Sequence, residues 1–491
     1  MTKEREKFGS RLGFILVAAG CAIGLGNVWK FPYMCGQYGG AIFILFYLLF
    51  LTIMGLPIII CEFSVGRGSG KSCATSFRVL EPKGRIWHRF GYFGMMGNYL
   101  LLMFYSMVAG WMLYYCYRYA TGEFLNLAIT QDIAGSNFEA MTASPSVMTI
   151  WTMIAIVVSA VVCSLGVQKG VEKITKVLMI GLLALIVVLA INSIRLPGAS
   201  EGIRFYLVPN LDAVREHGWG TVIFGAMSQS FFTLSIGMGG QAIFGSYLDK
   251  KRTLAGEAVN VLILDTFVAL MAGLIIIPAC FSFGIEPNAG PPLIFITLPH
   301  IFAQMPYGSV WGTLFFLFLS FAAITTVIGV LENIIAFAMD LWGFSRRKAV
   351  ISNVIALIVL SMPCILGWNV LKGIMPLGDG TNIMDLEDFL VSYNILPLGS
   401  VLYLMFCTSR YGWGWKNFIA EANTGSGLKL SEKVKGYMTF ALPVIVVAVY
   451  LKGYWDMFAS KGNTYLISWM IIALLFMGVI AWFAFGKKKE N

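Results

Sequence analysis

The chain has 491 residues, of which 58% are hydrophobic, 14% aromatic and 12% charged, and its mean hydropathy is +0.77. A soluble protein would carry charges on about one quarter of its residues, so this composition excludes a soluble enzyme. The aromatic content and the long apolar blocks also exclude a disordered or fibrous chain. The sequence therefore predicts an all-α protein that crosses a membrane many times.

Twelve apolar segments are long enough to cross a membrane, which takes about 20 residues in a helix. They are approximately residues 11–35, 40–65, 91–119, 148–166, 174–194, 220–247, 256–283, 308–342, 350–370, 386–407, 436–453 and 464–486. We therefore expect twelve transmembrane helices. Between them, we expect residues 120–147 to form a loop without Lys or Arg, and residues 284–306, a proline-rich segment, to form an ordered re-entrant cap.

The 35 Lys and Arg residues indicate the orientation, because such residues are enriched on the cytoplasmic side of membrane proteins. If residues 1–10 are inside, twelve spans return the C-terminal tail to the inside, and the cytoplasmic segments hold 27 of the 35. We therefore expect both termini to be cytoplasmic. The net charge of +10 is then a property of these loops and does not indicate a nucleic-acid partner. The nine cysteines are scattered without metal-binding spacing, which is typical of small buried apolar residues.

Glycine runs interrupt two of the spans at positions where a continuous helix would favour Ala or Leu. The interruptions are Gly20, Gly24 and Gly26 in the first span, and Gly237, Gly239 and Gly240 in the sixth. Close packing through small residues would explain one such run as well as an unwound segment would. Two runs, five helices apart, favour unwound segments, which a membrane protein tolerates where the freed backbone groups face protein, ions or water.

This spacing predicts two five-helix repeats of opposite orientation, each led by a broken helix, with substrate and ions bound at the unwound midpoints. The expected organisation has four parts. They are a cytoplasmic N-terminal segment (1–10), the first repeat (11–194), the second repeat with extracellular loops (195–407), and two extra helices with a cytoplasmic tail (408–491).

The first span, RLGFILVAAGCAIGLGNVWKFPY, resembles the neurotransmitter:sodium symporter family, and specifically its bacterial amino-acid transporters. The stretches FFTLSIGMG in the sixth span, FAAITTVIGVLE in the eighth and MDLEDF at the start of the tenth agree with this family in order and context. The resemblance covers essentially the whole chain. It implies a transporter rather than an enzyme.

The resemblance also implies two sodium sites, and oxygen-rich unwound backbone suits a hard cation. The first sodium site would use Ala22, Asn27, Thr233 and Asp265 together with the carboxylate of the substrate. The second would use Gly20, Ile23, Ala322, Thr325 and Thr326. Without the family context, the two threonine hydroxyls would be expected to bond back to the preceding helical turn.

Asp265 is the most informative single residue, because a carboxylate in the membrane interior is costly and usually functional. Many family members have Asn at this position, and animal relatives bind chloride nearby. Tyr47 and Gln229 match that chloride site, but Ala269 stands where its serine is expected. A fixed charge on Asp265 could replace chloride, so we expect a chloride-independent transporter. A protonatable Asp265 coupled to proton counter-movement is the alternative.

The substrate is expected between the two broken helices. Its carboxylate would meet the backbone N–H groups around Leu25 and Gly26 and the Tyr105 hydroxyl, and its amino group would meet carbonyls of the unwound segments. The residues implied for this site are Ala22, Gly24, Leu25, Gly26, Leu101, Tyr105, Phe232, Thr233, Ser235, Met238, Thr326, Val327 and Val330. The side-chain wall is apolar and contains no acid, which argues against an amine or a cationic amino acid.

Paired charges predict two gates. On the outside, Lys30 and Asp388 match the family's gate, with Phe232 and Tyr105 beneath them, although Lys lacks the bidentate geometry of Arg. On the inside, the resemblance pairs Arg5 with Asp340. A lone Arg5 would otherwise be an ordinary cytoplasmic anchor.

These observations predict sodium-driven import of a hydrophobic or aromatic L-amino acid, such as tyrosine, tryptophan or leucine, by alternating access. A non-transporting amino-acid sensor, or a symporter for another small neutral amino acid, is the alternative. A channel would need a continuous polar pore, and no HExxH or GxSxG motif indicates an enzyme. We expect a multi-pass protein of a bacterial inner membrane, in contact with lipid. The sequence leaves the amino acid, the sodium stoichiometry and the oligomeric state open, a homodimer included.

Overall fold

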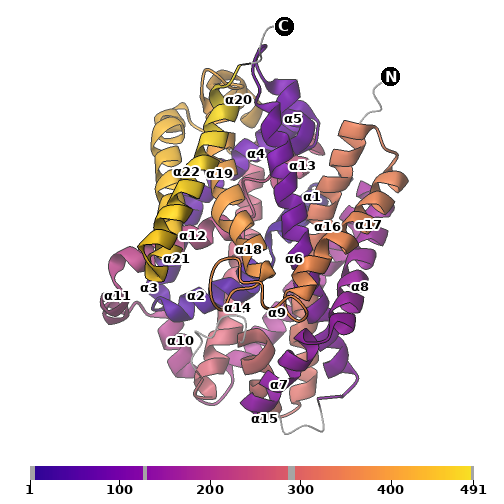
Figure 1. The fold of residues 1–491 in the computed structure, drawn as a ribbon, viewed down its shortest axis with the longest axis vertical. Coiled ribbons are helices and arrows are strands. Elements are labelled where there is room, and N and C mark those ends of the chain that lie inside the picture. Colours follow the sequence, from indigo (N-terminus) through magenta and orange to yellow (C-terminus); the bar gives the residue numbers. More distant parts are fainter. Residues whose placement is uncertain (1–5, 125–129, 286–292, 488–491) are drawn as a thin grey trace.

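The computed structural model describes residues 6–124, 130–285 and 293–487, which fold almost entirely into helices (Figure 1). The label η marks a π-helical turn, except in η6 and η8, which are 3₁₀ turns. Within these ranges, β-pairing is limited to two isolated bridges, Arg85 to Lys487 and Arg252 to Ser426.

The first half of the chain contains α1 (Arg11–Ala22), η1 (Gly26–Lys30), α2 (Phe31–Gln37), α3 (Ala41–Phe50), η2 (Leu51–Gly55), α4 (Leu56–Ser69), α5 (Cys73–Leu80), α6 (His88–Ala120), α7 (Gln131–Thr142), α8 (Pro145–Ser164), η3 (Val167–Glu172), α9 (Lys173–Ile194), α10 (Ala199–Leu207), α11 (Leu211–His217), α12 (Trp219–Thr233) and α13 (Gly240–Ser246). The second half contains α14 (Leu254–Ser282), η4 (Leu293–Thr297), α15 (Leu298–Gln304), α16 (Gly308–Trp342), α17 (Arg346–Leu366), α18 (Ile383–Phe389), η5 (Leu390–Ile395), α19 (Leu396–Thr408), α20 (Trp415–Ala422), η6 (Glu432–Val434), η7 (Tyr437–Ala441), α21 (Leu442–Phe458), η8 (Ala459–Lys461) and α22 (Asn463–Phe485).

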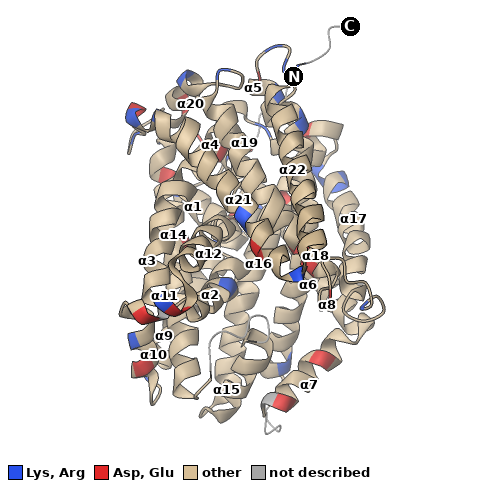
Figure 2. Cartoon of the chain, turned by 60° about the vertical axis from the view of Figure 1, so that its left-hand side comes forward, with Lys and Arg blue, Asp and Glu red and all other residues tan. Residues whose placement is uncertain are grey.

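The long helices form a bundle whose two ends differ in content. The first and last described segments of the chain lie at one end, beside α5 and α20, and we call this end the terminal face (Figure 1). Helices α7, α10 and α15 lie toward the other end, which we call the opposite face. Figure 2 shows that charged residues gather mostly at the two ends and leave the middle of the bundle largely apolar.

Apolar length explains why the chain folds this way. Within the described ranges, ten helices are long and apolar enough to cross a membrane, and the bent pair α1 and η1–α2 makes an eleventh. The apolar stretch of α16 is 83% buried inside the protein, whereas that of α22 is only 17% buried. Helix α16 is therefore a central helix, covered by its neighbours. A helix that is apolar on all sides and largely uncovered needs a lipid environment, so α22 faces the membrane.

The first expected span is broken near its middle. Helix α1 starts at the N-cap Ser10, whose hydroxyl accepts a hydrogen bond from Gly13 N at 3.0 Å, and it ends at Ala22. Ile23 has an extended ψ of 99°, and the chain resumes as η1 and α2 at an angle of 59°. Because the break falls at the predicted glycines, the prediction of a broken first helix is confirmed.

The sixth expected span, 220–247, is also broken, into α12 and the short α13. The connecting residues include Gly237 and Gly239, which have φ values of 102° and 80°, and Ser235, with φ of 49°. Positive φ is strained for a residue with a side chain, so Ser235 is held in place by its surroundings. Neither piece alone is long enough to cross a membrane, so this segment is absent from the eleven spans given above.

Two expected loops contain helices. Residues 120–147, predicted to be a loop, include all twelve residues of α7, a helix capped by Thr130. Segment 284–306 contains η4 and α15, so its described part is ordered as expected. Pro287, Pro291 and Pro292 lie outside the described residues. All nine cysteines are free and eight are buried, as their scattered positions predict.

Candidate functional site

The break in the first span exposes backbone groups to side chains from other helices. Leu25 N donates to the Tyr105 hydroxyl of α6 at 3.0 Å, and Gly24 N donates to Asn27 Oδ1 at 3.1 Å. Tyr105 is 5% exposed, so this bond is shielded from solvent. The structure therefore brings Tyr105 to the unwound backbone where the sequence analysis places a substrate carboxylate.

Two glycines make this close approach possible. A Cβ atom on Gly24 would overlap the Tyr105 hydroxyl and lie 2.9 Å from Thr326 Oγ1. A Cβ atom on Gly26 would lie 2.8 Å from Cδ1 of the Phe232 ring. The absence of side chains at these two positions lets α6, α12 and α16 converge on the break.

A buried polar cluster surrounds Asp265 of α14. Asn27 Nδ2 donates to Asp265 Oδ1 at 2.9 Å and to Thr233 Oγ1 at 2.8 Å, and Thr233 Oγ1 donates to Asp265 Oδ2 at 3.1 Å. The Tyr47 hydroxyl lies 3.4 Å from Thr233 Oγ1. All four side chains are fully buried. Carboxylate, amide and hydroxyl oxygens are the donors that a hard cation prefers, so this cluster has the chemistry for a sodium ion.

A second oxygen cluster lies where α16 meets the break in the first span. Thr326 Oγ1 lies within 3.3 Å of three carbonyl oxygens, those of Gly20, Ile23 and Ala322. A hydroxyl carries one proton, so three acceptors share one donor and their lone pairs are in excess. This arrangement also suits a small cation. The Thr325 hydroxyl instead bonds back to Phe321 O at 2.9 Å and to Ala322 O at 3.0 Å.

The apolar residues expected to form the side-chain wall are mostly buried. Leu101 is 6% exposed, Met238 1%, and Val327 and Val330 are fully buried. Phe232 and Ser235 are half-buried. Ala22 ends α1 directly beside the break. The positions predicted for the substrate therefore lie at the junction of the two broken helices with α6 and α16.

The predicted outer gate is arranged differently from a simple ion pair. The Lys30 ammonium lies 3.8 Å from the centre of the Phe232 ring, over its face. Asp388 accepts a hydrogen bond from the Ser392 hydroxyl at 2.6 Å. Among the described residues, no ion pair joins Lys30 to Asp388 within 4.0 Å. The role of these two residues as a gate stays a prediction.

At the terminal face, Arg5 of the predicted inner gate lies outside the described residues. Asp340 accepts a hydrogen bond from Ser72 N at 2.8 Å and lies 3.6 Å from Lys71 Nζ. The Arg5–Asp340 pair therefore stays a prediction.

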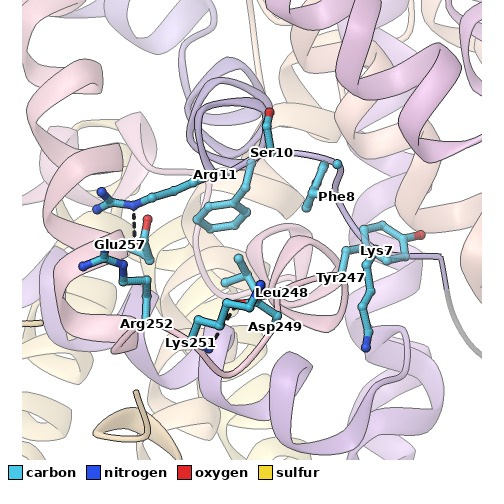
Figure 3. A pocket seen from close by; sticks show the side chains of 12 residues that line it. Lys7, Phe8, Ser10, Arg11, Tyr247, Leu248, Asp249, Lys251, Arg252 and Glu257 are labelled. Carbon is cyan, nitrogen blue, oxygen red and sulfur yellow. Dashed lines mark hydrogen bonds and ion pairs between the residues drawn. The ribbon is translucent and has the colours of Figure 1, made fainter. Parts of the chain in front are cut away.

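The segment before α1 is held by neighbouring helices at this end. Glu172 accepts hydrogen bonds from Gly9 N at 2.6 Å and from the Ser10 hydroxyl at 2.7 Å. Arg11 forms an ion pair with Glu257 at 2.8 Å. The Phe8 ring meets the Tyr247 ring edge-on at 5.7 Å. A cavity of about 370 Å³ lies between the segment and the 247–257 region, and Figure 3 shows Phe8, Tyr247, Arg11 and Glu257 among the residues that line it.

Several polar residues at the site were missed by the sequence analysis. Glu62 of α4 is fully buried and accepts hydrogen bonds from Gly237 N and, at 3.2 Å, from Gln241 N. A lone Glu within an apolar span was a signal that could have been used. Asn98 of α6 and Asn333 of α16 are bonded to each other at 2.9 Å, and nothing in the sequence pairs them.

Comparisons with known proteins match most of the chain. The family model described as "Sodium:neurotransmitter symporter family" matches residues 5–131 and 138–485. The chain is similar to the uncharacterized sodium-dependent transporter YhdH of Bacillus subtilis, with 32% identity over 91% of this chain and 97% of that protein. It is 25% identical to the sodium- and chloride-dependent GABA transporter 2 of Rattus norvegicus, over 98% and 86% of the two chains. The crystal structure of MhsT in complex with L-phenylalanine superimposes with a TM-score of 0.80, at 37% identity over 91% of this chain and 99% of that one.

Proposed function

Since this chain belongs to the sodium:neurotransmitter symporter family and is a sodium-dependent transporter, we propose that it imports a hydrophobic or aromatic L-amino acid by alternating access. The observation that carries this proposal is the meeting of two unwound helices at buried oxygen clusters, beside an apolar wall. Unwound segments at the centre of a membrane protein supply the backbone groups that bind a substrate and its coupling ions.

The first sodium ion would bind at the Asp265 cluster with Ala22, Asn27 and Thr233. The carboxylate of the amino acid would complete its coordination and would also meet Leu25 N, Gly26 N and the Tyr105 hydroxyl. Sodium and substrate would then each supply part of the other's site. This shared coordination is the physical basis for coupled movement.

The second sodium ion would bind between the broken first helix and α16. Its ligands would be the carbonyls of Gly20, Ile23 and Ala322 with the hydroxyls of Thr325 and Thr326. The excess of acceptors around Thr326 supports this assignment. Thr325 would have to turn its hydroxyl away from Phe321 O to contribute.

The proposed substrate class is supported by the apolar character of Leu101, Phe232, Met238, Val327 and Val330, the residues of the expected wall. The wall contains no carboxylate, so a cationic side chain would lack a partner, and its apolar surface favours a hydrophobic or aromatic group. The solved structure of MhsT, a relative at 37% identity, is in complex with L-phenylalanine. Its ligand is of the class that we propose here.

We further propose that transport is independent of chloride. Asp265 would supply the negative charge beside the first sodium ion, and Ala269 offers no hydroxyl to an anion near Tyr47 and Gln229. Lys30 with Asp388, and Arg5 with Asp340, would close the two ends in turn. In this proposal the terminal face is cytoplasmic, the membrane is a bacterial inner membrane, and the twelve spans form two inverted repeats of five with two extra helices.

Uptake into proteoliposomes tests this proposal. With an inward sodium gradient, labelled leucine, phenylalanine and tyrosine should accumulate equally well in chloride and in gluconate. Saturable binding without sodium-driven accumulation would instead identify a sensor. Uptake only in chloride would show that the negative charge of Asp265 does not replace chloride.

A variant of Asp265 tests the chloride proposal directly. Asp265→Asn should lower uptake in gluconate by more than tenfold, because the sodium site loses its fixed charge. The matched control is Asp249→Asn, which alters an exposed carboxylate next to Lys251. If Asp265→Asn transports normally in gluconate, the charge on Asp265 is not what makes chloride dispensable.

A further inference from the structure

Two asparagines lie directly beneath the predicted side-chain wall. Asn98 of α6 is three residues from Leu101, and Asn333 of α16 is three residues from Val330, so each lies one helical turn from a wall residue and on the same helical face. Both are fully buried, and Asn333 Nδ2 donates to Asn98 Oδ1 at 2.9 Å. The pair therefore bridges α6 and α16 one helical turn from the wall residues.

The pair also holds the unwound part of the sixth span. Asn98 Nδ2 donates to Met238 O at 2.9 Å and to Gly94 O at 2.8 Å. Asn333 Nδ2 donates to Gly239 O at 3.3 Å. These acceptors fix the orientation of both amides, because turning either one over would place an oxygen against a carbonyl oxygen. The wall residue Met238 is therefore tied to the amide pair through its own backbone.

One acceptor remains after these bonds are counted. The four amide protons are all used, and Asn98 Oδ1 is used by Asn333. Asn333 Oδ1 has no hydrogen-bond partner among the described residues, although it is buried. A buried acceptor without a donor is costly, so such an atom calls for a ligand or a water molecule.

We propose that Asn333 Oδ1 accepts a hydrogen bond from the side chain of the transported amino acid, so that this chain prefers aromatic amino acids with a donor on the ring. The inference rests on the proposed function and narrows it to tyrosine and tryptophan. A phenol O–H or an indole N–H combines an apolar body for the wall with a donor at its far end. Phenylalanine and leucine would fill the wall and leave Asn333 Oδ1 unpaired. Serine and threonine are too short to reach one turn below the wall.

The test compares substrates that differ in one group. In proteoliposomes of the native chain, kcat/KM is measured for tyrosine and for 4-methylphenylalanine, in which a methyl group of similar size replaces the hydroxyl. We expect tyrosine to be favoured about tenfold, the scale of one hydrogen bond made or left unmade. A ratio near one would overturn the inference. Leucine uptake is followed in parallel, because its absence together with that of both aromatic substrates would refute the proposed function itself.

The variant Asn333→Leu assigns the preference to this residue. The tyrosine to 4-methylphenylalanine ratio should fall to within about twofold of one, because the acceptor is gone. Both substrates are measured on the same vesicles, so the fraction of folded protein cancels in the ratio. The matched control is Asn260→Leu in α14, whose amide bonds only to Gly256 O of its own helix, at 2.9 Å. If the tyrosine to 4-methylphenylalanine ratio in Asn333→Leu equals that of the native chain, another group accepts the hydrogen bond from the substrate ring.

Discussion

The two halves of the first span are held in contrasting ways. At the terminal face, the start of α1 is bonded to Glu172, paired with Glu257 through Arg11, and packed by Phe8 against Tyr247. Beyond the break, Lys30 at the end of η1 meets Phe232 through the face of its ring. Several directed polar contacts hold the start of α1. Beyond the break, Asn27 is held by the buried Asp265 cluster, and Lys30 is covered by an aromatic ring. Opening at the terminal face must therefore break several polar contacts together, whereas opening around Lys30 must break a cation–π contact.

The largest effect is expected from removing the polar contacts that hold α1, the half of the first span at the terminal face. Glu172→Ala removes both bonds to the N-terminus of α1 and the negative charge near it, and a hydrogen bond to a charged group contributes about 1.5–3 kcal/mol. Amide hydrogen exchange in residues 9–20 should rise by about tenfold or more, and sodium-driven uptake should fall similarly. Glu139→Ala in α7, an exposed acid, is the control. Unchanged exchange in residues 9–20 would show that the aromatic contacts alone hold this half.

An intermediate effect is expected at the break that joins the two halves. Tyr105→Phe removes the hydroxyl that bonds Leu25 N and leaves this buried donor unpaired, which costs about 1–3 kcal/mol. The KM for the amino acid should rise about tenfold with a smaller change in kcat. Tyr99→Phe is the matched control, because its hydroxyl lies on the same helix but bonds Asn353 at 2.5 Å. Equal changes in KM for the two variants would argue against substrate contact at Tyr105.

The smallest effect is expected beyond the break. Lys30→Met removes one cation–π contact, worth about 0.5–2 kcal/mol, so release of bound amino acid should accelerate about threefold. Lys452→Met, which alters another lysine above an aromatic ring, that of Phe224 at 5.2 Å, should leave the release rate unchanged. A loss of affinity far above tenfold for Lys30→Met would mean that an ion pair with Asp388 forms during transport.

Much of this arrangement can be predicted from the sequence because it depends on local patterns. The length of each apolar segment predicts a span, and the glycine runs predict both breaks. Both signals depend only on the residues of the segment itself. Helix α7 was missed because its residues are polar and partly exposed, which is also typical of a loop. The family resemblance names the residues of the Asp265 cluster, and three of those named for the first sodium site, Asn27, Thr233 and Asp265, meet in the structure.

The sequence does not predict which residues far apart in the chain contact each other. The Asn98–Asn333 pair joins positions 235 residues apart, and Glu172 meets Gly9 from 163 residues away. Each of these residues is unremarkable in its own segment. Helical periodicity says which face a residue occupies, but the choice of neighbouring helix depends on how the whole bundle packs.

The π-helical turn η2 has a consequence for how this sequence can vary. Such a turn holds about one residue more than an α-helical turn, and it joins α3 to α4 without a kink-forming gap. The wide turn absorbs this extra residue, so deleting one residue between Leu51 and Gly55 would restore an α-helical turn and leave the helix after it facing nearly the same way. The same deletion inside α4, before Glu62, would rotate Glu62 by about 100°, away from Gly237 and Gln241, which it now contacts. In an alignment of related chains, single-residue gaps should therefore be tolerated in η2 and rejected in the first part of α4.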